Sequence, residues 1–436
     1  MRRWICGLFL CGLASTTWAA LTAEENAAAI ERLRTALQEQ YSYRDLHGVD
    51  WEKLLKERSA VLTTAKTSEQ FADETAKLLA AARDMHIWVE VNGNTFGTWC
   101  PDAPAPANVN TATLAKLVPG WTQRSKAVWS GQYPDGIGYI LITTWNREPA
   151  VLEPALDALK ELAGSKALIV DVRPNSGGAE GLAMKFAGCF VAKPKAYAGN
   201  VTIQKGRFGP PTTRTIKPNR TGPAYRGKVA VLMGPANMSS CESFLLMMKQ
   251  VPGCVLIGGK SFGSSGNPKP VALGNGVTVY LPSWKDLRLD GSCFEGVGIA
   301  PDLEVKTTAG DLAVRDPVVA AALKVLRDET LKIEVAPVKT PTVQSREEVA
   351  EALLGQWEVE KSNGYHGTWT FTSDGKVTNS DRHPLTTHWT IESGAVMIRW
   401  NNKLWESLTL PIDPAGSTGP CWQGTAKAVK VREKRG

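Results

Sequence analysis

Residues 228–250 read KVAVLMGPANMSSCESFLLMMKQ, and this stretch decides the fold. The apolar run from Lys228 to Met233 predicts a strand that is buried on both faces. A short loop rich in Gly, Pro and Asn follows, and Ser239 to Gln250 then predicts a helix. A buried strand that leads directly into a helix is typical of an α/β unit with a largely parallel sheet.

The same alternation of strand and helix surrounds this stretch. Further strands are predicted at 138–142, 167–172 and 255–258, and further helices at 151–162 and 178–190. We therefore expect one α/β core from residue 137 to residue 333.

Three amphipathic helices are expected before this core. Thr22 and Glu25 form a capping box for the first, and Asp50 and Ser68 cap the second and third. His86 then lies at a junction between helix and strand. The expected N-terminal helical domain covers residues 20–91, and the Pro- and Gly-rich segment 92–136 is expected to be a loop-rich connection with one short element.

The last part of the chain differs in composition. Residues 334–345 predict a linker, because they contain two prolines and no apolar periodicity. Residues 346–436 contain six tryptophans among short alternating runs, with a hairpin signal at Asp374-Gly375. They predict a small antiparallel β domain, a sheet or a barrel, with tryptophans in its core.

The first 19 residues predict a signal peptide. Arg2 and Arg3 precede the short apolar run from Trp4 to Ala14, and small residues surround a cleavage point near Ala19. We therefore expect an exported protein, periplasmic or secreted, without a membrane span, since no later stretch reaches about 20 apolar residues.

Composition excludes several classes of partner and cofactor. The chain is 43% hydrophobic and 21% charged, which is ordinary for globular domains. Its net charge of +7 is scattered, so nucleic-acid binding is not expected. Six cysteines follow the signal peptide without a CxxC pair, which predicts no metal site and makes one or two disulfides plausible in an oxidising compartment.

Three loops at predicted strand ends collect unusual residues: 171–178, 237–242 and 290–302. Backbone N–H groups where a helix begins can hold a developing oxyanion, and a serine there can act as a nucleophile. Each loop also has a simpler explanation, because Gly suits tight turns and Ser commonly caps helices.

Taken together, the motifs along the chain resemble peptidase family S41, which includes C-terminal-processing proteases, the tricorn core protease and interphotoreceptor retinoid-binding protein. The matching features are Asp84-Met-His86, Gly138-Tyr-Ile140, Arg173-x-Asn175-x-Gly177-Gly178, Ser239-x-x-Glu242, Gly259-x-Ser261-Phe262-Gly263 and Glu295-x-x-Gly298-x-x-Pro301-Asp302. The resemblance implies a crotonase-like catalytic core, and segment 92–136 is too short for an inserted PDZ domain.

The resemblance also implies site residues. Ser239 falls on the nucleophile, and the N–H group of Ser240 together with that of Gly177 or Gly178 forms the oxyanion hole. Members with a Ser/Lys site carry a lysine directly after the Phe-Gly pair, where this chain has Ser264.

The tricorn-like branch uses a histidine and a glutamate instead, and these positions fall on His86 and Glu295. His86 is also favoured by elimination, since three of the five histidines lie in the C-terminal domain and His47 lies in a polar turn. Where the tricorn-type site has a serine before the histidine, this chain has Met85. Lys260 is a minor alternative base.

The predicted function is a serine endopeptidase acting on extended or unfolded protein substrates, with no cofactor. Two alternatives stay open. One is a non-catalytic binding protein of the same fold for an apolar ligand or peptide, and the other is an esterase-like acyl hydrolase with the same nucleophile.

Overall fold

The structure is a computed structural model of the 436-residue chain. It describes residues 20–101, 108–146, 151–328, 346–362, 364–380, 385–392, 395–400, 405–409, 412, 417–421 and 424–431. The expected signal peptide, residues 1–19, and the expected linker, residues 334–345, lie outside the described residues.

The α/β unit contains a sheet of seven strands. Its order is β15 (Leu303–Glu304), β11 (Cys254–Gly258), β10 (Lys228–Met233), β6 (Ala167–Asp171), β5 (Ile137–Ile142), β4 (Val128–Gln132) and β3 (Thr122–Gln123). The strands from β15 to β5 are parallel, and β4 and β3 add an antiparallel edge. Because helices cover both faces, β6 is buried at every position, as its uninterrupted apolar run predicts.

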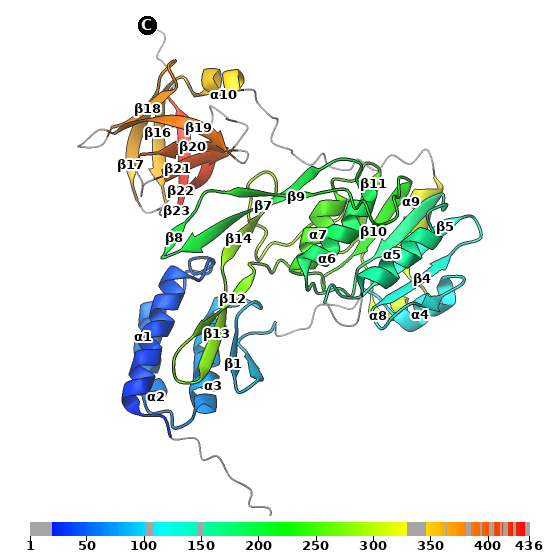
Figure 1. Cartoon of the computed structure of the whole chain (residues 1–436), viewed down its shortest axis with the longest axis horizontal. Coiled ribbons are helices and arrows are strands. Elements are labelled where there is room, and N and C mark those ends of the chain that lie inside the picture. Colours follow the sequence, from blue (N-terminus) through cyan, green and yellow to red (C-terminus); the bar gives the residue numbers. More distant parts are fainter. Residues whose placement is uncertain are drawn as a thin grey trace, which may run out of the picture.

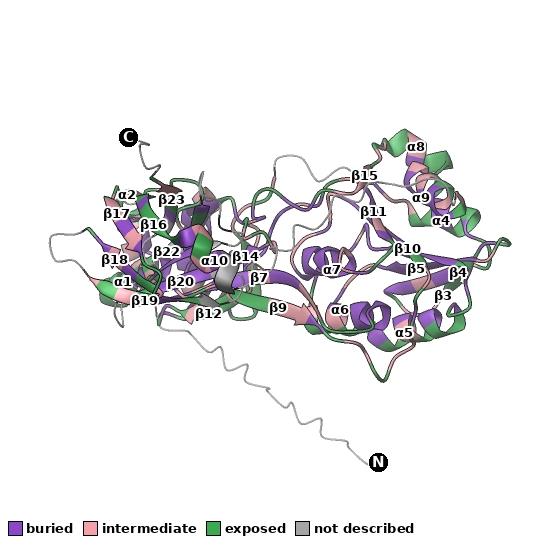
Figure 2. Cartoon of the chain, turned by 90° about the horizontal axis from the view of Figure 1, so that it is seen from above, coloured by how far each residue is buried: buried purple, intermediate pink, exposed green. Residues whose placement is uncertain are grey.

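Helices cover both faces of this sheet (Figure 1). One core joins the sheet to α5 (Leu152–Glu161), α6 (Glu180–Ala187) and α7 (Ser240–Met248), and the 3-10 turn η2 (Gly188–Phe190) extends α6. The core on the other face includes α4 (Thr111–Leu117) and α9 (Pro317–Arg327), and α8 (Ala309–Val314) packs beside α4. Figure 2 shows the central strands and α7 buried, while the outer sides of α4 and α8 are exposed.

The N-terminal unit combines helices with a second sheet. Its helices are α1 (Ala23–Glu39), α2 (Trp51–Thr63) and α3 (Ser68–Leu79), which the 3-10 turn η1 (Ala80–Ala82) extends. Its sheet has the order β12 (Pro268–Ala272), β13 (Val277–Pro282), β1 (Trp88–Val91) and β2 (Asn94–Gly97). The unit expected to be helical therefore takes two of its strands from the segment expected to be core.

A third sheet connects the units. It has the order β14 (Trp284–Leu287), β7 (Lys195–Gln204) and β8 (Arg207–Phe208), with β9 (Thr212–Ile216) paired to β7. Figure 1 shows the helices α1–α3 and the C-terminal domain at one end of the molecule and the α/β unit at the other, with β7 and β9 between them.

The C-terminal domain is a closed barrel of eight antiparallel strands, preceded by α10 (Arg346–Leu353). The strands are β16 (Gly355–Lys361), β17 (His366–Phe371), β18 (Lys376–Asn379), β19 (Thr386–Glu392), β20 (Ala395–Arg399), β21 (Trp405–Thr409), β22 (Ser417–Cys421) and β23 (Gly424–Lys430). Trp357, Trp369, Trp389 and Trp400 are buried in its core. The predicted fold class, an α/β core with an N-terminal helical unit and a C-terminal antiparallel β domain, is confirmed.

Three details differ from the sequence expectations. The cap of α3 is Thr67, whose hydroxyl accepts from the N–H of Gln70, and Ser68 is the first helical residue. Segment 92–136 contains β2, α4, β3 and β4 rather than one short element, because β2 pairs with the adjacent β1, and β3 and β4 extend the edge of the large sheet beside β5. The disulfide expectation is wrong for the described cysteines, since Cys100, Cys189, Cys241, Cys254 and Cys293 are all free thiols.

A fully buried arginine fixes the strand ends of the α/β unit. The guanidinium of Arg173 pairs with the carboxylates of Asp171 and Asp316, with nearest distances of 2.6 and 2.8 Å, and all three side chains are buried. It also donates to the Asn108 carbonyl oxygen at 2.6 Å. Asp316 also caps α9. The cluster therefore joins the end of β6 to α9, on the face of the sheet that α4 and α9 cover.

We expect Arg173→Met to lower the free energy of unfolding by about 3–5 kcal/mol, because it leaves two carboxylates buried without a counter-charge. Urea unfolding followed by circular dichroism measures this. The matched control is Arg327→Met, which removes an exposed pair with Asp135 and should cost below about 1 kcal/mol. Equal losses for the two variants would contradict the role given to Arg173.

Candidate active site

Ser239 stands at the junction of β10 and α7 in an unusual conformation. Its backbone has φ 56° and ψ −131°. Residues other than glycine rarely adopt this region, and it costs them about 1–3 kcal/mol. Its side chain makes no capping hydrogen bond and is partly exposed. The simpler explanation of Ser239 as a helix cap is therefore not met, and its hydroxyl is presented to solvent.

Two glycines lie beside Ser239, and neither position has room for a side chain. A Cβ on Gly177 would lie 2.9 Å from the Ser239 Cβ, and a Cβ on Gly178 would lie 2.4 Å from the Trp145 carbonyl carbon. Both glycines also have positive φ, 108° and 133°. Only glycine allows this loop to approach the start of α7 so closely.

The backbone N–H groups around Ser239 are not equivalent. The N–H of Gly177 already donates to Asn175 Oδ1 at 2.9 Å. Trp145 pairs with the Gly177 carbonyl oxygen and the Ala179 N–H, so the N–H of Gly178 points away from Trp145. Among the described residues, the N–H groups of Gly178 and Ser240 have no hydrogen-bond acceptor, which leaves this pair available for an anion.

His86 lies in the turn between η1 and β1, where Asp84 holds its backbone. The Oδ1 atom of Asp84 accepts from the His86 N–H at 2.8 Å, and its Oδ2 atom accepts from the Tyr41 hydroxyl at 3.0 Å. The imidazole Nδ1 lies 2.6 Å from the hydroxyl of Ser264. Burial lowers the pKa of His86 to about 4, so its imidazole is neutral near pH 7.

Ser264 brings His86 and Ser239 into one hydrogen-bonded unit. Its carbonyl oxygen accepts from the Ser239 N–H at 2.7 Å, while its hydroxyl contacts the imidazole. Within the described residues, no hydrogen bond joins the Ser239 hydroxyl to His86 directly. Hydrogen bonds of this kind in unliganded sites often form only with substrate bound.

Glu242, one turn into α7 from Ser239, holds the Ser264 loop. Its buried carboxyl accepts from the Ser261 hydroxyl at 2.5 Å and from the N–H groups of Gly263 and Ser264 at 2.8 and 3.0 Å. Burial raises the pKa of Glu242 to about 8, and this effect outweighs the hydrogen bonds, which lower it. The Glu242 carboxyl therefore anchors the loop in its neutral form near pH 7.

Glu295 is close to this loop but contacts the next serine. Its Oε2 accepts from the N–H and the hydroxyl of Ser265 at 2.6 and 2.9 Å, and the Tyr43 hydroxyl lies 2.8 Å from the Ser265 hydroxyl. Burial first, and then the charge of Asp84, raise the pKa of Glu295 well above its usual range. No hydrogen bond joins Glu295 to the imidazole among the described residues.

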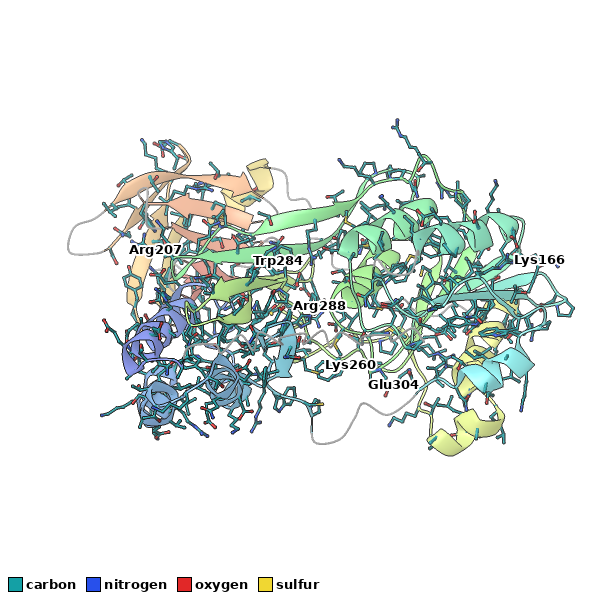
Figure 3. The ribbon with its side chains drawn as sticks, turned by 60° about the horizontal axis from the view of Figure 1, so that its bottom comes forward. Lys166, Arg207, Lys260, Trp284, Arg288 and Glu304 are labelled. Atoms are coloured by element: carbon teal, nitrogen blue, oxygen red, sulfur yellow. The ribbon has the colours of Figure 1, made fainter. Side chains whose placement is uncertain are left out.

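The loop that carries Glu295 is fastened by Arg288, which Figure 3 labels at the centre of the molecule. Arg288 donates to the Gly298 carbonyl oxygen at 2.6 Å and to the Ser292 hydroxyl at 3.0 Å. Lys260, also labelled in Figure 3, is exposed and has no hydrogen bond or ion pair with a described residue. The minor alternative base is thus not joined to Ser239.

The described part of the chain holds no cluster of three or more His, Cys, Asp or Glu side chains placed for a metal ion. No described helix combines the length and apolar character required to cross a bilayer.

Sequence reasoning did not identify Ser265, Tyr43 or Arg288, and it treated Ser264 only as the residue in place of a lysine. The one local signal was the pair Ser264-Ser265 directly after Phe262-Gly263. The partners of this pair come from positions about 180 and 220 residues upstream and 30 residues downstream, which no local pattern encodes.

We expect Ser239→Gly to be more stable than Ser239→Ala by about 1 kcal/mol. Glycine releases the strain at φ 56°, and its larger conformational freedom in the unfolded chain offsets only part of this gain. Thermal and urea unfolding of both variants, with wild type as the reference, measure the difference. Equal stability of the two variants would show that the Ser239 backbone is unstrained.

Known proteins are similar to parts of this chain. The carboxy-terminal processing protease CtpB of Bacillus subtilis is 27% identical over 187 residues, which are 42% of this chain and 37% of CtpB. A CtpA-like serine protease of Staphylococcus epidermidis is 27% identical over 144 residues, which are 33% of this chain and 28% of the relative. The match thus spans about a third of the length of these curated relatives.

Solved structures share the fold over a longer part of the chain. A candidate peptidase from Parabacteroides merdae has a TM-score of 0.61 at 21% identity, covering 71% of this chain and 98% of its own. Mature CPAF has a TM-score of 0.52 at 11% identity, covering 71% and 99%.

The family model described as peptidase family S41 matches residues 136–305. This range contains Ser239, Glu242, Ser264 and Glu295, while His86 lies outside it on the N-terminal unit. The α/β core between residues 136 and 305 is thus a peptidase family S41 domain.

Proposed function

We propose that this protein is an exported serine endopeptidase that hydrolyses extended or unfolded protein substrates. Ser239 is the nucleophile, His86 is the general base, and Glu295 supports the loop beside the base by binding Ser265. The observation that carries the proposal is the arrangement at the start of α7. There a strained, partly exposed serine, whose hydroxyl has no hydrogen bond with a described residue, stands beside two backbone N–H groups without a described acceptor.

In the proposed mechanism, the Ser239 hydroxyl attacks the peptide carbonyl carbon while its proton passes to the imidazole of His86. The resulting oxyanion accepts hydrogen bonds from the N–H groups of Gly178 and Ser240, the two that have no other described acceptor. The imidazolium returns the proton to the leaving amine. Water then hydrolyses the acyl-enzyme by the same route.

The contacts of His86 support the choice of base, because Ser264 links its imidazole to the Ser239 backbone. A neutral imidazole accepts a proton, and the lowered pKa of His86 keeps this ring neutral. Lys260 is exposed and has no hydrogen bond or ion pair with a described residue, so no contact joins it to Ser239.

Export is proposed from the N-terminal sequence alone, in which Arg2 and Arg3 precede an apolar run and a cleavage point. A peptidase that acts on unfolded chains without a fixed sequence would then meet its substrates outside the cytoplasm.

Covalent labelling tests the nucleophile. We expect a fluorophosphonate probe to label the purified protein, Ser239→Ala to abolish labelling, and His86→Ala to slow it by about 100-fold or more. Lys260→Ala is the matched control and should label like wild type. Dye-labelled unfolded casein should compete with the probe and be cleaved.

A folded wild-type protein that takes no label would contradict the peptidase proposal and favour a non-catalytic binding protein of the same fold. Labelling and ester hydrolysis without casein cleavage would instead favour an acyl hydrolase.

The pH dependence tests the base. A general base acts when it is unprotonated, and the pKa of His86 of about 4 keeps it unprotonated at lower pH than an ordinary histidine, whose pKa is about 6.5. Burial raises the pKa of the neighbouring Asp84 to about 6 and that of Glu295 well above its usual range, so these carboxyls add little attraction for an imidazolium.

We therefore expect the acid limb of kcat/KM for casein cleavage to lie near pH 4 to 5, and activity at pH 5.5 to stay close to that at pH 7. Circular dichroism at each pH confirms that the protein is folded. A limb near pH 6.5 would show that His86 titrates as an exposed histidine.

A further inference from the structure

The loop from Phe262 to Gly266 carries two adjacent serines with different partners. The Ser264 hydroxyl lies 2.6 Å from the imidazole Nδ1 of His86. The Ser265 hydroxyl instead donates to Glu295 at 2.9 Å and contacts the Tyr43 hydroxyl. The imidazole and the predicted supporting carboxylate are therefore bound to neighbouring residues rather than to each other.

The nearby carboxyl groups bind donors other than the His86 ring. Asp84 accepts from the backbone N–H of His86 and from Tyr41, and Glu242 accepts from its own loop. Among the described residues, Ser264 is the only group that makes a hydrogen bond with the imidazole. A ring without a carboxylate partner agrees with the lowered pKa of His86, because nothing offsets the cost of burying its charge.

Ser264 is not itself placed to attack a substrate. It is 1% exposed, whereas Ser239 is partly exposed and has a free hydroxyl. The backbone of Ser264 is held on both sides, since its N–H donates to Glu242 at 3.0 Å and its carbonyl oxygen accepts from the Ser239 N–H. The hydroxyl is thus fixed relative to both the nucleophile and the base.

We propose that Ser264 is a positioning residue for His86, with its hydroxyl taking the place that a carboxylate holds in a Ser-His-acid triad. By occupying Nδ1, it leaves Nε2 as the nitrogen that exchanges a proton with Ser239. When the Ser239 proton has moved to Nε2, both ring nitrogens carry hydrogen, and the Nδ1–H group donates to the Ser264 oxygen. Ser264 neither gains nor loses a proton in the cycle. Glu295 binds Ser265 and does not contact the ring.

This inference rests on the proposed function for its kinetic test. We expect Ser264→Ala to lower kcat for casein cleavage by about 10–100-fold with KM nearly unchanged. The imidazolium, a charged donor, loses the Ser264 oxygen as its hydrogen-bond acceptor, while the buried Ser264 side chain does not touch substrate. Ser264→Thr keeps the hydroxyl and should recover most of kcat. Ser265→Ala is the matched control, and its loss of kcat should be several-fold smaller.

A second measurement does not depend on catalysis. In the inactive Ser239→Ala protein, NMR titration of the His86 ring gives its pKa directly. We expect a further lowering in Ser239→Ala/Ser264→Ala, because the charged ring has lost its acceptor, and no change in Ser239→Ala/Ser265→Ala. Circular dichroism confirms the fold, and Ser264→Gly, which also removes the hydroxyl, replaces Ser264→Ala if the alanine variant fails to fold.

The two tests separate the two proposals. If Ser239 takes no fluorophosphonate label but the His86 titration depends on Ser264, the proposed function fails while the contact between Ser264 and His86 is retained. If labelling succeeds but Ser264→Ala keeps the kcat and the His86 pKa of its parent, the positioning role is overturned.

Discussion

The candidate site depends on one buried carboxyl, that of Glu242. It is fully buried on α7 and binds three donors of the loop from Ser261 to Ser264. That loop in turn holds the Ser239 N–H and the His86 ring. Without an acceptor at Glu242, three buried donors would lose their partners, and each would cost about 1–3 kcal/mol. The geometry around the nucleophile is therefore set by a residue that does not contact the reacting atoms.

The α/β core could be predicted from the sequence because its signals are local. Strand β6 is an apolar run up to Val170, and α7 follows a short loop that contains Gly234, Pro235 and Asn237, so period and turn chemistry indicate both elements. The second sheet could not be predicted in the same way. Strand β1 pairs with β13, about 190 residues further along the chain, and alternation within Trp88–Val91 does not identify that partner.

Site residues divide along the same line. Ser239, Gly177 and Gly178 could be predicted from sequence. A nucleophile at a strand-to-helix junction needs a sharp turn and close backbone approach, and both requirements favour recognisable residue types in the local sequence. Ser264 has no such local signal, since its partners come from Asp84-Met-His86, from α7 and from Ser239 itself. The difference between Gly177 and Gly178 is likewise invisible in sequence, because it depends on the Asn175 side chain taking one N–H and leaving the other.

Burial also decides the charge state of the site. His86, Glu242 and Glu295 all have pKa values moved toward their neutral forms, with burial as the largest cause in each case. A triad in which a carboxylate touches the imidazole stabilises the imidazolium by direct attraction, and the price is a second buried charge. In this chain a hydroxyl provides the contact, so the resting site carries little charge and its acceptors and donors are fixed by backbone bonds. Such a site keeps the His86 ring neutral to low pH and stabilises its protonated form less. Ser264 sets the balance between these two forms.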